Sequence, residues 1–448
     1  MKTLHEYLTE YGKTNAYAFH MPGHKGICCD AKDITEIDGF DDLHEPEGII
    51  LGEMERISNV YSTKKSYILV GGSTLGNLVS IFSSCSNQGD LIIDRSCHKS
   101  VYNASVVARA NLTYMNQFDL ESVKQAVSEA KSARALVITA PTYEGYMPDV
   151  GSIADIAHEK GKILIVDAAH GAHLGFDERF PESPVSQGAD IVVMSLHKTL
   201  PALTMTAVLH VCSDRVSLSA IEKAIDIFET SSPSYLLMDS VSCCMSMLES
   251  SENLFSDYYG RLMQFYDNCE ELENIKVDKE PSPVKDPGKI RILSNNPAGL
   301  YQDLIEKYHL QPEMKTPECV LMMTSICDTD EGFNRLFNAL REMDQSGKYI
   351  RENEGVDFDI SPNATNECRM PIYEAVFKDT IEKNMKEAAS SICGSYIIQY
   401  PPGSPIVVPG EVITEDTIER IKHLMDSGVK VTGLGTDSNG FTTISVVQ

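Results

Sequence analysis

Short runs of apolar residues recur along the chain from about residue 66 onward. The clearest runs are Tyr67–Val70, Leu91–Ile93, Ala135–Ile138, Ile163–Val166 and Ile191–Met194. Continuous apolar runs of this length are typical of strands in a parallel sheet that is covered on both faces. We therefore expect these segments to be neighbouring strands of one buried sheet.

Helical patterns lie between the apolar runs. Apolar residues recur at helical spacing within residues 120–130, and Asp119 is suited to cap the start of that helix. The same spacing returns within residues 153–157, and Gly161 follows as a stop signal. Strands and helices that alternate in this way predict an α/β layered fold.

Polar, glycine-rich or ionisable residues follow all of the predicted strands. The five segments read, in order, GGSTLGN, DRSCHKS, PTYEGY, DAAHGAH and SLHKT. Ligands of α/β sheets bind at the carboxyl ends of the strands. Since all the strand ends carry such residues, the sequence predicts one site at that edge of the sheet.

The C-terminal third has a different pattern, typical of a smaller α+β domain. Residues 270–300 are rich in Pro, Lys, Asp and Asn and are interpreted as a connection. The elements expected after it are a helix near 300–308, a strand Cys319–Cys327, helices near 331–343 and 373–388, a strand near Tyr396–Gln399 and a last helix capped by Thr414. We divide the chain into an N-terminal segment 1–60, a large domain 61–285 and a small domain 286–448.

The charge balance narrows the range of partners. Acidic side chains outnumber basic ones by 65 to 38, for a net charge of -27. This argues against a nucleic acid or an anionic membrane as partner, and it is compatible with a cationic small substrate. Most of the charge is expected to be solvated surface, and net charge does not describe a pocket.

Cysteine spacing and hydropathy suggest a cytoplasmic protein without a metal site. The twelve cysteines are scattered, and no CxxC motif has a matching second pair. Reduced thiols are the simpler interpretation. The N-terminus lacks an apolar signal region, and no apolar run approaches the length of a membrane span.

Lys198 is the first candidate for chemistry. It follows an apolar strand within the segment Ser195–Thr199, where His197 precedes it. A lysine attacks a carbonyl only as the neutral amine, which burial and a nearby cation favour. Taken alone, a solvated surface lysine is the more common alternative.

Asp167 makes the functional interpretation of Lys198 more specific. It ends the apolar run ILIV, 31 residues before Lys198. Pyridoxal 5′-phosphate (PLP) withdraws electrons only while its pyridine nitrogen is protonated, and a buried carboxylate maintains that state. An aspartate at a strand end can instead cap a helix, but the pair across one βαβ unit points to a PLP site in which Lys198 forms the Schiff base.

Two further segments complete this candidate site. The turn Gly71–Gly76 opens a helix whose N–H groups, with the hydroxyls of Ser73 and Thr74, suit a phosphate. His98 can lie flat on a pyridine ring, or it can be a helix-terminal histidine that faces water. His170 and His173 form a possible metal pair, although packing is the favoured interpretation.

Together these residues are similar to those of fold-type I PLP enzymes, and more narrowly of the prokaryotic ornithine/lysine/arginine decarboxylases. The resemblance covers nearly the whole chain. It rests on the ordered segments FHMPGHKG (Phe19–Gly26), DDLHEPEG, GGST, HKS, PTYEG, VDAAHGAH, SLHKTLPALT, SSPSYLLM and YPPGSPIVVPGE. It implies an aspartate-aminotransferase-like large domain with a mostly parallel seven-stranded sheet, a smaller α+β C-terminal domain, and the short form of the family without an N-terminal receiver-like domain.

The resemblance also implies a role for each matching residue. Lys198 would form the internal aldimine, Asp167 would pair with the pyridinium nitrogen, and His98 would stack on the ring. Ala169 would pack under the ring. The phosphate would be held by Ser73, Thr74, Ser195 and His197. Ser231 would reach the phosphate of a partner subunit, since the family builds its sites at the interface of a homodimer.

The activity implied is α-decarboxylation of arginine, lysine or ornithine, which gives a di- or polyamine and CO₂. Asp41, Asp42, Glu45 and Glu47 could face the substrate's distal cation, but a solvated or structural loop is the favoured interpretation.

Three positions depart from the family pattern, which usually has an acidic residue at Ala168, Gln at Met205 and a basic, Gly-containing segment at Ser391–Ser395. These departures leave open a second PLP reaction, namely elimination, cyclisation or aminotransfer. A regulator without activity is a third hypothesis, which the joint retention of Lys198, Asp167 and His98 disfavours.

Overall fold

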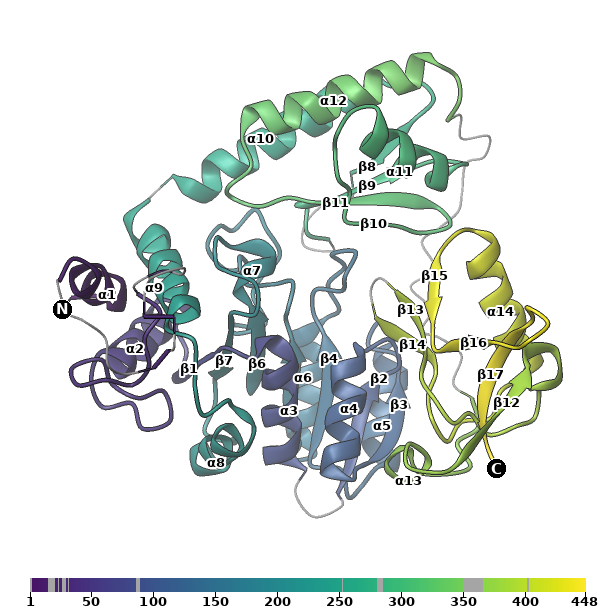
Figure 1. The fold of residues 1–448 in the computed structure, drawn as a ribbon, viewed down its shortest axis with the longest axis horizontal. Helices are drawn as coiled ribbons and strands as arrows, with labels where there is room; N and C mark the ends of the chain where they lie inside the picture. The colour runs from purple at the N-terminus through teal and green to yellow at the C-terminus, as the bar shows by residue number, and fades with distance from the viewer. Residues whose placement is uncertain are drawn as a thin grey trace.

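A seven-stranded sheet forms the centre of the molecule (Figure 1). The computed structural model describes residues 2–14, 21–22, 24–25, 30, 32–85, 89–251, 253–279, 285–349, 366–400 and 403–448. The strand order is β1-β7-β6-β5-β4-β2-β3, and only β7 runs antiparallel to its neighbours. This confirms the predicted α/β class and the mostly parallel sheet.

The central sheet and its helices alternate along the chain. The strands are β1 Lys65–Leu69, β2 Asp90–Asp94, β3 Asn111–Met115, β4 Ala135–Thr139, β5 Ile163–Asp167, β6 Ile191–Ser195 and β7 Ala207–Val211. The helices are α3 Gly72–Ser84, α4 Lys99–Ala108, α5 Leu120–Glu129, α6 Val150–Glu159, the single turn α7 Leu196–Thr199, and α8 Leu218–Phe228. All five predicted strands and both predicted helices are therefore confirmed.

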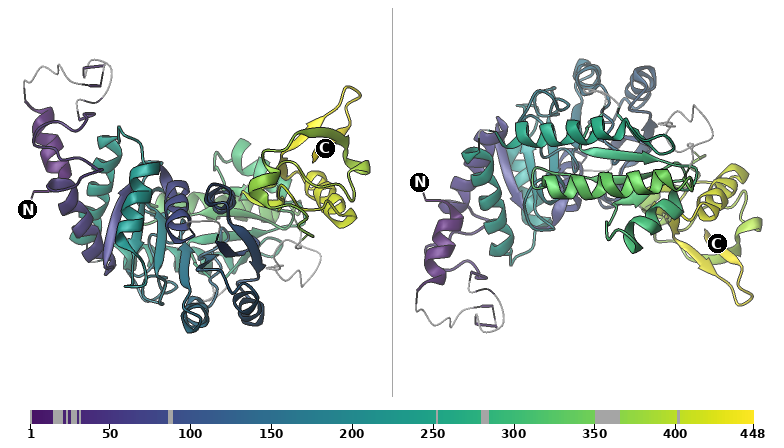
Figure 2. Two further views of the ribbon diagram at one scale, coloured as in Figure 1. Left: turned by 90° about the horizontal axis from the view of Figure 1, so that it is seen from below. Right: turned by 90° about the horizontal axis from the view of Figure 1, so that it is seen from above.

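Helices cover both faces of this sheet, as Figure 2 shows from two further sides. Helix α3 packs with α4 and α8, whereas α5 packs with α6. Except for the edge strand β3, the strands are buried along nearly their whole length, which explains their continuous apolar sequence. Asp119 caps α5 by accepting the N–H of Glu121, as predicted.

Gly76 lets α3 approach the sheet closely. A Cβ atom at this position would lie 2.4 Å from Cγ1 of Val193 on β6. Any side chain here would push the helix away from the strand. The glycine-rich turn therefore fixes the first turn of α3 beside the carboxyl end of β6.

The N-terminal segment adds α1 Leu4–Gly12 and α2 Ile49–Tyr61. Both pack against α9, Tyr235–Ser250, which follows the last strand of the central sheet and α8 in sequence. Buried Leu4 and Leu8 belong to the main hydrophobic core. The N-terminal segment is thus built onto the side of the large domain.

A second, four-stranded sheet lies above the first in Figure 1. It contains β8 Lys276–Asp278, β9 Lys289–Leu293, β10 Met314–Lys315 and β11 Cys319–Met323, with α10 Leu254–Cys269, α11 Pro297–Glu306 and α12 Asp330–Gln345. The interpretation of residues 270–300 as a connection is therefore wrong. The segment KIRIL forms strand β9 and is buried at every position, although it contains two basic residues.

The C-terminal part forms two small antiparallel sheets around its own core. Its elements are α13 Ile372–Ala375, β12 Thr380–Asn384, η1 Met385–Glu387, β13 Ile397–Tyr400, β14 Ser404–Val407, α14 Glu415–Asp426, β15 Lys430–Thr432, β16 Leu434–Thr436 and β17 Thr442–Val447. The helix predicted near 373–388 is wrong, because all five residues of β12 pair with β17. Thr414 caps α14 as predicted. The division into three domains stays a prediction.

A buried ion pair joins the C-terminal part to the central sheet. Nη2 of Arg95, just after β2, lies 3.0 Å from Oε2 of Glu411, and the two side chains are 1% and 0% exposed. Arg95 also donates to the carbonyls of Pro405 and Ile406 and to the hydroxyl of Tyr102. The guanidinium is thus the hub of this junction.

Replacing Arg95 by Met should therefore destabilise the protein strongly. The substitution leaves the Glu411 carboxylate buried without its cation, which costs about 3–5 kcal/mol in the free energy of unfolding. Urea denaturation measures this cost. Lys124→Met at the exposed pair with Glu121 is the matched control, and it should change stability by less than about 1 kcal/mol. Equal stability of the two variants would contradict the assignment.

Candidate active site

Lys198 lies in α7, directly after the carboxyl end of β6. Its Nζ is 3.2 Å from Nε2 of His170, which follows β5. Burial lowers the pKa of Lys198, although the carboxylate of Asp167 opposes the shift. The lowered pKa favours the neutral amine that attack on a carbonyl requires.

Asp167 ends β5 and is 3% exposed. Its Oδ2 accepts a hydrogen bond of 2.8 Å from Nδ2 of Asn77 on α3, and its Oδ1 accepts one of 3.1 Å from the N–H of Ala169. Asn77 also donates to Ser100 on α4. A buried carboxylate held by neutral donors can serve as the partner of a pyridinium nitrogen.

His98 caps the N-terminus of α4. Its Nδ1 lies 2.8 Å from Oγ of Ser100 and accepts the N–H of the same residue. The next residue, Lys99, donates its N–H to the carbonyl of Gly403, and Ser404 donates to the carbonyl of Ser96. The C-terminal part therefore borders His98, which the sequence alone did not reveal.

The predicted phosphate ligands come from α3 and β6. Gly71 precedes α3 and offers no side-chain cap. The N–H of Gly72 is donated to the carbonyl of Met205, so the N–H groups of Ser73 and Thr74 are the ones available to an anion. Oγ of Ser195 is buried and has no hydrogen-bond partner among the described residues. This orphaned hydroxyl fits a phosphate.

The other predicted ligands are placed as follows. Nδ1 of His197 lies 3.0 Å from the carbonyl of Thr206, which leaves Nε2 as the ring nitrogen for a ligand. Ala169 is buried next to Asp167. Ser231 is exposed in the turn between α8 and α9, and its contact with a partner subunit stays a prediction.

Lys289 is a site residue that sequence reasoning missed. It begins β9, is 1% exposed, and its Nζ lies 2.7 Å from Nδ1 of His170. Gly145 makes this approach possible, because its φ is +98° and a Cβ there would lie 2.7 Å from Cγ of Lys289. The signal in the sequence that could have pointed to Lys289 is its position at the start of the largely apolar segment KIRIL.

A second missed group is Glu313, which precedes β10. It accepts a hydrogen bond from the hydroxyl of Tyr143, whose ring lies 4.6 Å from the ring of His170. Glu313 also acts on Lys198 and Lys289 by charge. An exposed carboxylate thus faces the site from the second sheet.

The acidic loop before α2 has a structural role, as favoured from the sequence. Asp41 accepts the N–H groups of Gly48 and Ile50 at 2.8 and 2.9 Å, together with that of Glu47. It thereby caps the start of α2. Its carboxylate is satisfied by the backbone and is not the acid of this site.

The departures from the family pattern differ in their surroundings. Ala168 is fully buried, so an acidic side chain at this position would be desolvated. Met205 is 53% exposed, and its carbonyl accepts the N–H of Gly72 at the start of α3. Its φ of +78° is unusual for a residue with a side chain. Much of the motif FHMPGHKG lies outside the described residues.

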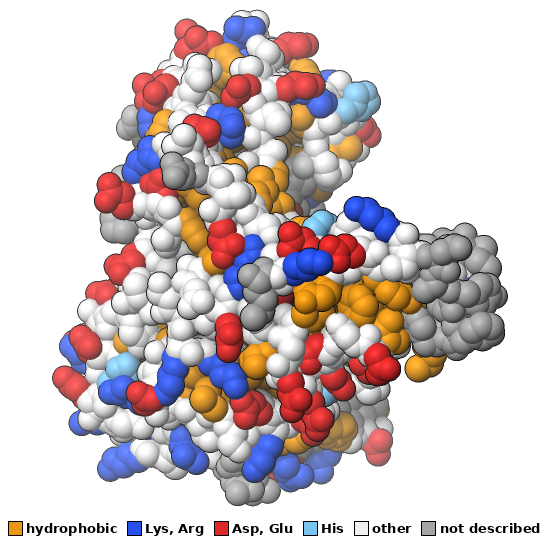
Figure 3. All heavy atoms as spheres, turned by 90° about the vertical axis from the view of Figure 1, so that its left-hand side faces the viewer, with side chains coloured by type: hydrophobic (Ala, Val, Ile, Leu, Met, Phe, Trp, Pro, Cys, Tyr) orange, Lys and Arg blue, Asp and Glu red, His pale blue; other side chains and the backbone are white. Residues whose placement is uncertain are grey.

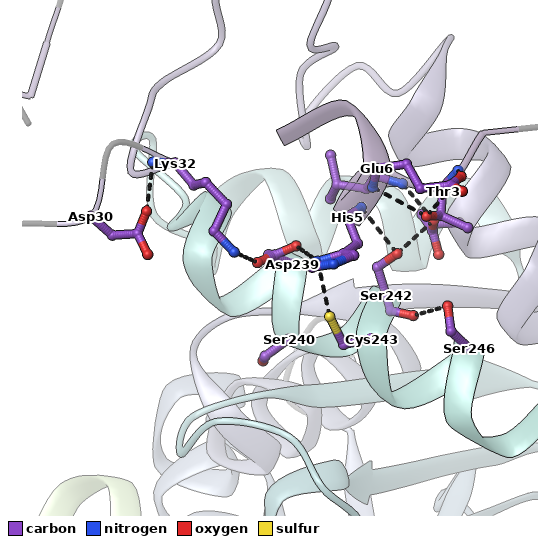
Figure 4. A network of polar contacts seen from close by, with 12 residues as sticks. Thr3, His5, Glu6, Asp30, Lys32, Asp239, Ser240, Ser242, Cys243 and Ser246 are labelled. Carbon is purple, nitrogen blue, oxygen red and sulfur yellow. Dashed lines mark hydrogen bonds and ion pairs between the residues drawn. The ribbon is translucent and has the colours of Figure 1, made fainter. Parts of the chain in front are cut away.

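A polar network links α1 to α9 away from Lys198 (Figure 4). Nδ1 of His5 lies 2.7 Å from Oδ1 of Asp239 and 3.0 Å from Sγ of Cys243, and these atoms are close enough to hold a metal ion. Nζ of Lys32 already lies 2.6 Å from Oδ2 of Asp239. Because this ammonium balances the carboxylate, we assign the network a structural role. The predicted absence of a metal stays a prediction.

Within the described parts of the chain, no helix has both the length and the apolar character needed to cross a membrane.

Comparison with protein families gives two matches. A family model described as "Orn/Lys/Arg decarboxylase, major domain" matches residues 2–287, and one described as "Orn/Lys/Arg decarboxylase, C-terminal domain" matches residues 361–445. The "Uncharacterized protein YaaO" of Bacillus subtilis is 30% identical, over 96% of this chain and 95% of its own length. An arginine decarboxylase of the same organism is 27% identical, over 95% of this chain and 94% of its own.

Comparison with solved structures supports the same fold. The Francisella novicida lysine decarboxylase LdcF matches with a TM-score of 0.84 over 99% of this chain and 81% of its own, at 18% identity. At this identity the likeness speaks for the fold alone. The predicted fold-type I architecture is confirmed.

Asn77 should matter for cofactor affinity, because it fixes the Asp167 carboxylate. Asn77→Leu removes the hydrogen bond to the Asp167 carboxylate, which is worth about 1.5–3 kcal/mol because the acceptor is charged, and the weaker one to the neutral hydroxyl of Ser100. We expect the affinity for PLP to fall about tenfold, as measured by absorbance titration.

Asn111→Leu is the matched control, because Asn111 donates to Asp90 in an exposed amide–carboxylate pair. This variant should bind PLP like the unmodified chain. Equal affinities for PLP in the two variants would contradict the role of Asn77.

Proposed function

The chain belongs to the Orn/Lys/Arg decarboxylase family, and on that premise we propose that it decarboxylates a basic amino acid with PLP as cofactor. The family depends on PLP, and the residues present fit this group. The observation that carries the proposal is the grouping of Lys198, Asp167 and His98 at one edge of the central sheet. A chain that had lost its chemistry would have no need of all three.

The cofactor, when bound, supplies a carbonyl for the substrate amine and a ring that accepts electrons from Cα. Lys198 would hold it through the side-chain amine. Asp167 would keep a negative charge beside the ring nitrogen, and His98 would lie on the ring face. The first turn of α3 and Ser195 would hold the phosphate.

Proton transfer falls to the chain's own residues. The carboxylate that leaves as CO₂ must be replaced at Cα by a proton. Nζ of Lys198 and the imidazole of His98 are the two candidate donors. Lys198 is half-buried, and this partial burial limits the access of water, which favours a protein donor over solvent.

A basic substrate needs an acidic partner for its distal cation. Glu313 is the carboxylate that best meets this need, because it accepts a hydrogen bond from the hydroxyl of Tyr143 and its charge acts on Lys198. Arginine, lysine and ornithine remain the candidate substrates. Carbon dioxide and the corresponding di- or polyamine are the expected products.

We further propose a cytoplasmic homodimer. Large hydrophobic side chains are exposed at Leu203, Met205 and Ile227. Figure 3 shows hydrophobic side chains gathered on the side of the molecule that carries the N-terminal helices. Burial of this surface against a second copy would bring Ser231 toward the partner's phosphate site.

A second candidate function is another reaction of the same Cα carbanion, namely elimination, cyclisation or aminotransfer. It is favoured by Ala168 and by the exposed apolar side chain of Met205, which replace polar residues of the family pattern. Keto acid, ammonia or a product that retains the carboxylate would identify it.

The proposed activity is tested by measuring CO₂ release from arginine, lysine and ornithine by the PLP-loaded protein. We expect release from at least one of them, and loss of at least a thousandfold in Lys198→Ala. A loaded, folded protein that releases no CO₂ from any of the three would contradict decarboxylation. Product analysis of the same reactions separates the second candidate.

Glu313→Gln should weaken substrate binding without stopping the chemistry. Loss of the carboxylate removes one charged contact, so we expect KM for the preferred substrate to rise about tenfold or more while kcat changes less. Glu318→Gln is the control, because Glu318 lies nearby in the connection between β10 and β11. A KM that stays unchanged in Glu313→Gln would exclude this residue as the partner of the distal cation.

A further inference from the structure

A half-buried lysine and a buried one meet at one imidazole. His170 lies 3.2 Å from Nζ of Lys198 through Nε2, and 2.7 Å from Nζ of Lys289 through Nδ1. Lys198 comes from the end of β6, whereas Lys289 comes from β9 of the second sheet. The three side chains therefore form a continuous chain of nitrogen groups across the two sheets.

The hydrogen bonds of this chain limit its charge. Burial, together with the two lysines, lowers the pKa of His170 well below its usual value, so the ring is neutral. A neutral imidazole has one N–H and one lone pair. One lysine can donate to the lone pair as an ammonium, and the other must then accept from the N–H as a neutral amine.

We propose that Lys198 and Lys289 share a single ammonium charge through His170, with Lys289 as a positioning residue that takes the proton which Lys198 must lose. When Lys198 gives a proton to Nε2, Nδ1 gives its own proton to Lys289. The imidazole changes tautomer, and no charge is created or lost. This inference rests on the proposed role of Lys198 as the cofactor-binding lysine.

The surrounding charges support such sharing. Burial lowers the pKa of Lys289 to about 8, with Asp286 opposing the shift and Lys198 adding to it. Asp167 faces Lys198, and Glu313 acts on both lysines. The acidic residues around Lys198, His170 and Lys289 thus stabilise one positive charge on these three groups.

Other ionisable groups surround the three side chains of Lys198, His170 and Lys289. His98 and His173 face His170, and Glu144 acts on Lys289. His173 is occupied by Asp286, whose Oδ2 lies 3.2 Å from its Nε2. Asp286 also accepts the N–H of Gly288. No carboxylate contact at hydrogen-bond distance occupies Nζ of Lys289 among the described residues, which leaves His170 as its partner.

The segment that carries Lys289 is fixed in place. Asp286 donates its N–H to the carbonyl of Gly145, and Lys289 donates its N–H to the carbonyl of Asp286. Tyr146 pairs with Lys285 as an isolated bridge. The turn after β4 therefore positions Lys289 toward His170.

The test is the pH dependence of acylation of Lys198 in the full chain without cofactor, followed by peptide mass spectrometry. Only the neutral amine reacts, so the profile reports the pKa of Lys198. Lys289→Met removes the alternative site for the proton and its positive charge, so Lys198 should hold its proton to higher pH. We expect the midpoint to rise by about one unit, which slows labelling about tenfold below the midpoint.

Lys289→Arg gives the opposite expectation. A guanidinium stays charged and cannot take up a proton, so the midpoint of Lys198 should stay the same or fall. Lys285→Met is the matched control, since Lys285 is an equally buried lysine of the same segment that faces Asp278. It should leave the profile unchanged. Thermal unfolding checks that each variant is folded.

An unchanged midpoint in folded Lys289→Met, or shifts of the same sign in the Met and Arg variants, would overturn the proposal. In a His170→Phe background the effect of Lys289→Met should largely vanish. An undiminished effect would show a charge acting through space and would refute the part assigned to the imidazole. Because labelling needs neither cofactor nor turnover, its outcome is separate from that of the CO₂ assay.

Discussion

Desolvation of amines is the constraint around which this site is organised. Lys198 and Lys289 lie where burial disfavours the charged form, and within the described part of the chain His170 is the neutral acceptor between them. Water could hold both ammonium groups, but a buried imidazole cannot. A group that must react as a free amine at ordinary pH is thus obtained from packing rather than from a special residue type.

Sequence reasoning found the residues that are fixed by strand ends. Lys198, Asp167 and His98 each follow a buried apolar run, and parallel strands bring such ends to one edge of a sheet. Lys289 and Glu313 were missed because they come from the second sheet, more than a hundred residues from the motifs they meet. Only tertiary packing brings these parts together, and local pattern carries no signal for it.

The errors in secondary structure have the same origin. The content of Pro, Lys, Asp and Asn in residues 270–300 suggests a connection, although every residue of β9 within it is buried. Strand β12 reads as polar and exposed, and it exists because it pairs with β17. By contrast, the capped helices α5 and α14 were predictable, since a cap depends on residues within one turn.

The residues of the candidate site come from two different sheets, and each sheet supplies groups for a different role. The groups that we propose for the cofactor come from the central sheet and α3, which one continuous core fixes. Lys289 and Glu313 come from the second sheet, and Gly145 allows that sheet to approach. Changes in the second sheet can therefore alter the amine's proton or the substrate's distal contact while the cofactor groups stay in place.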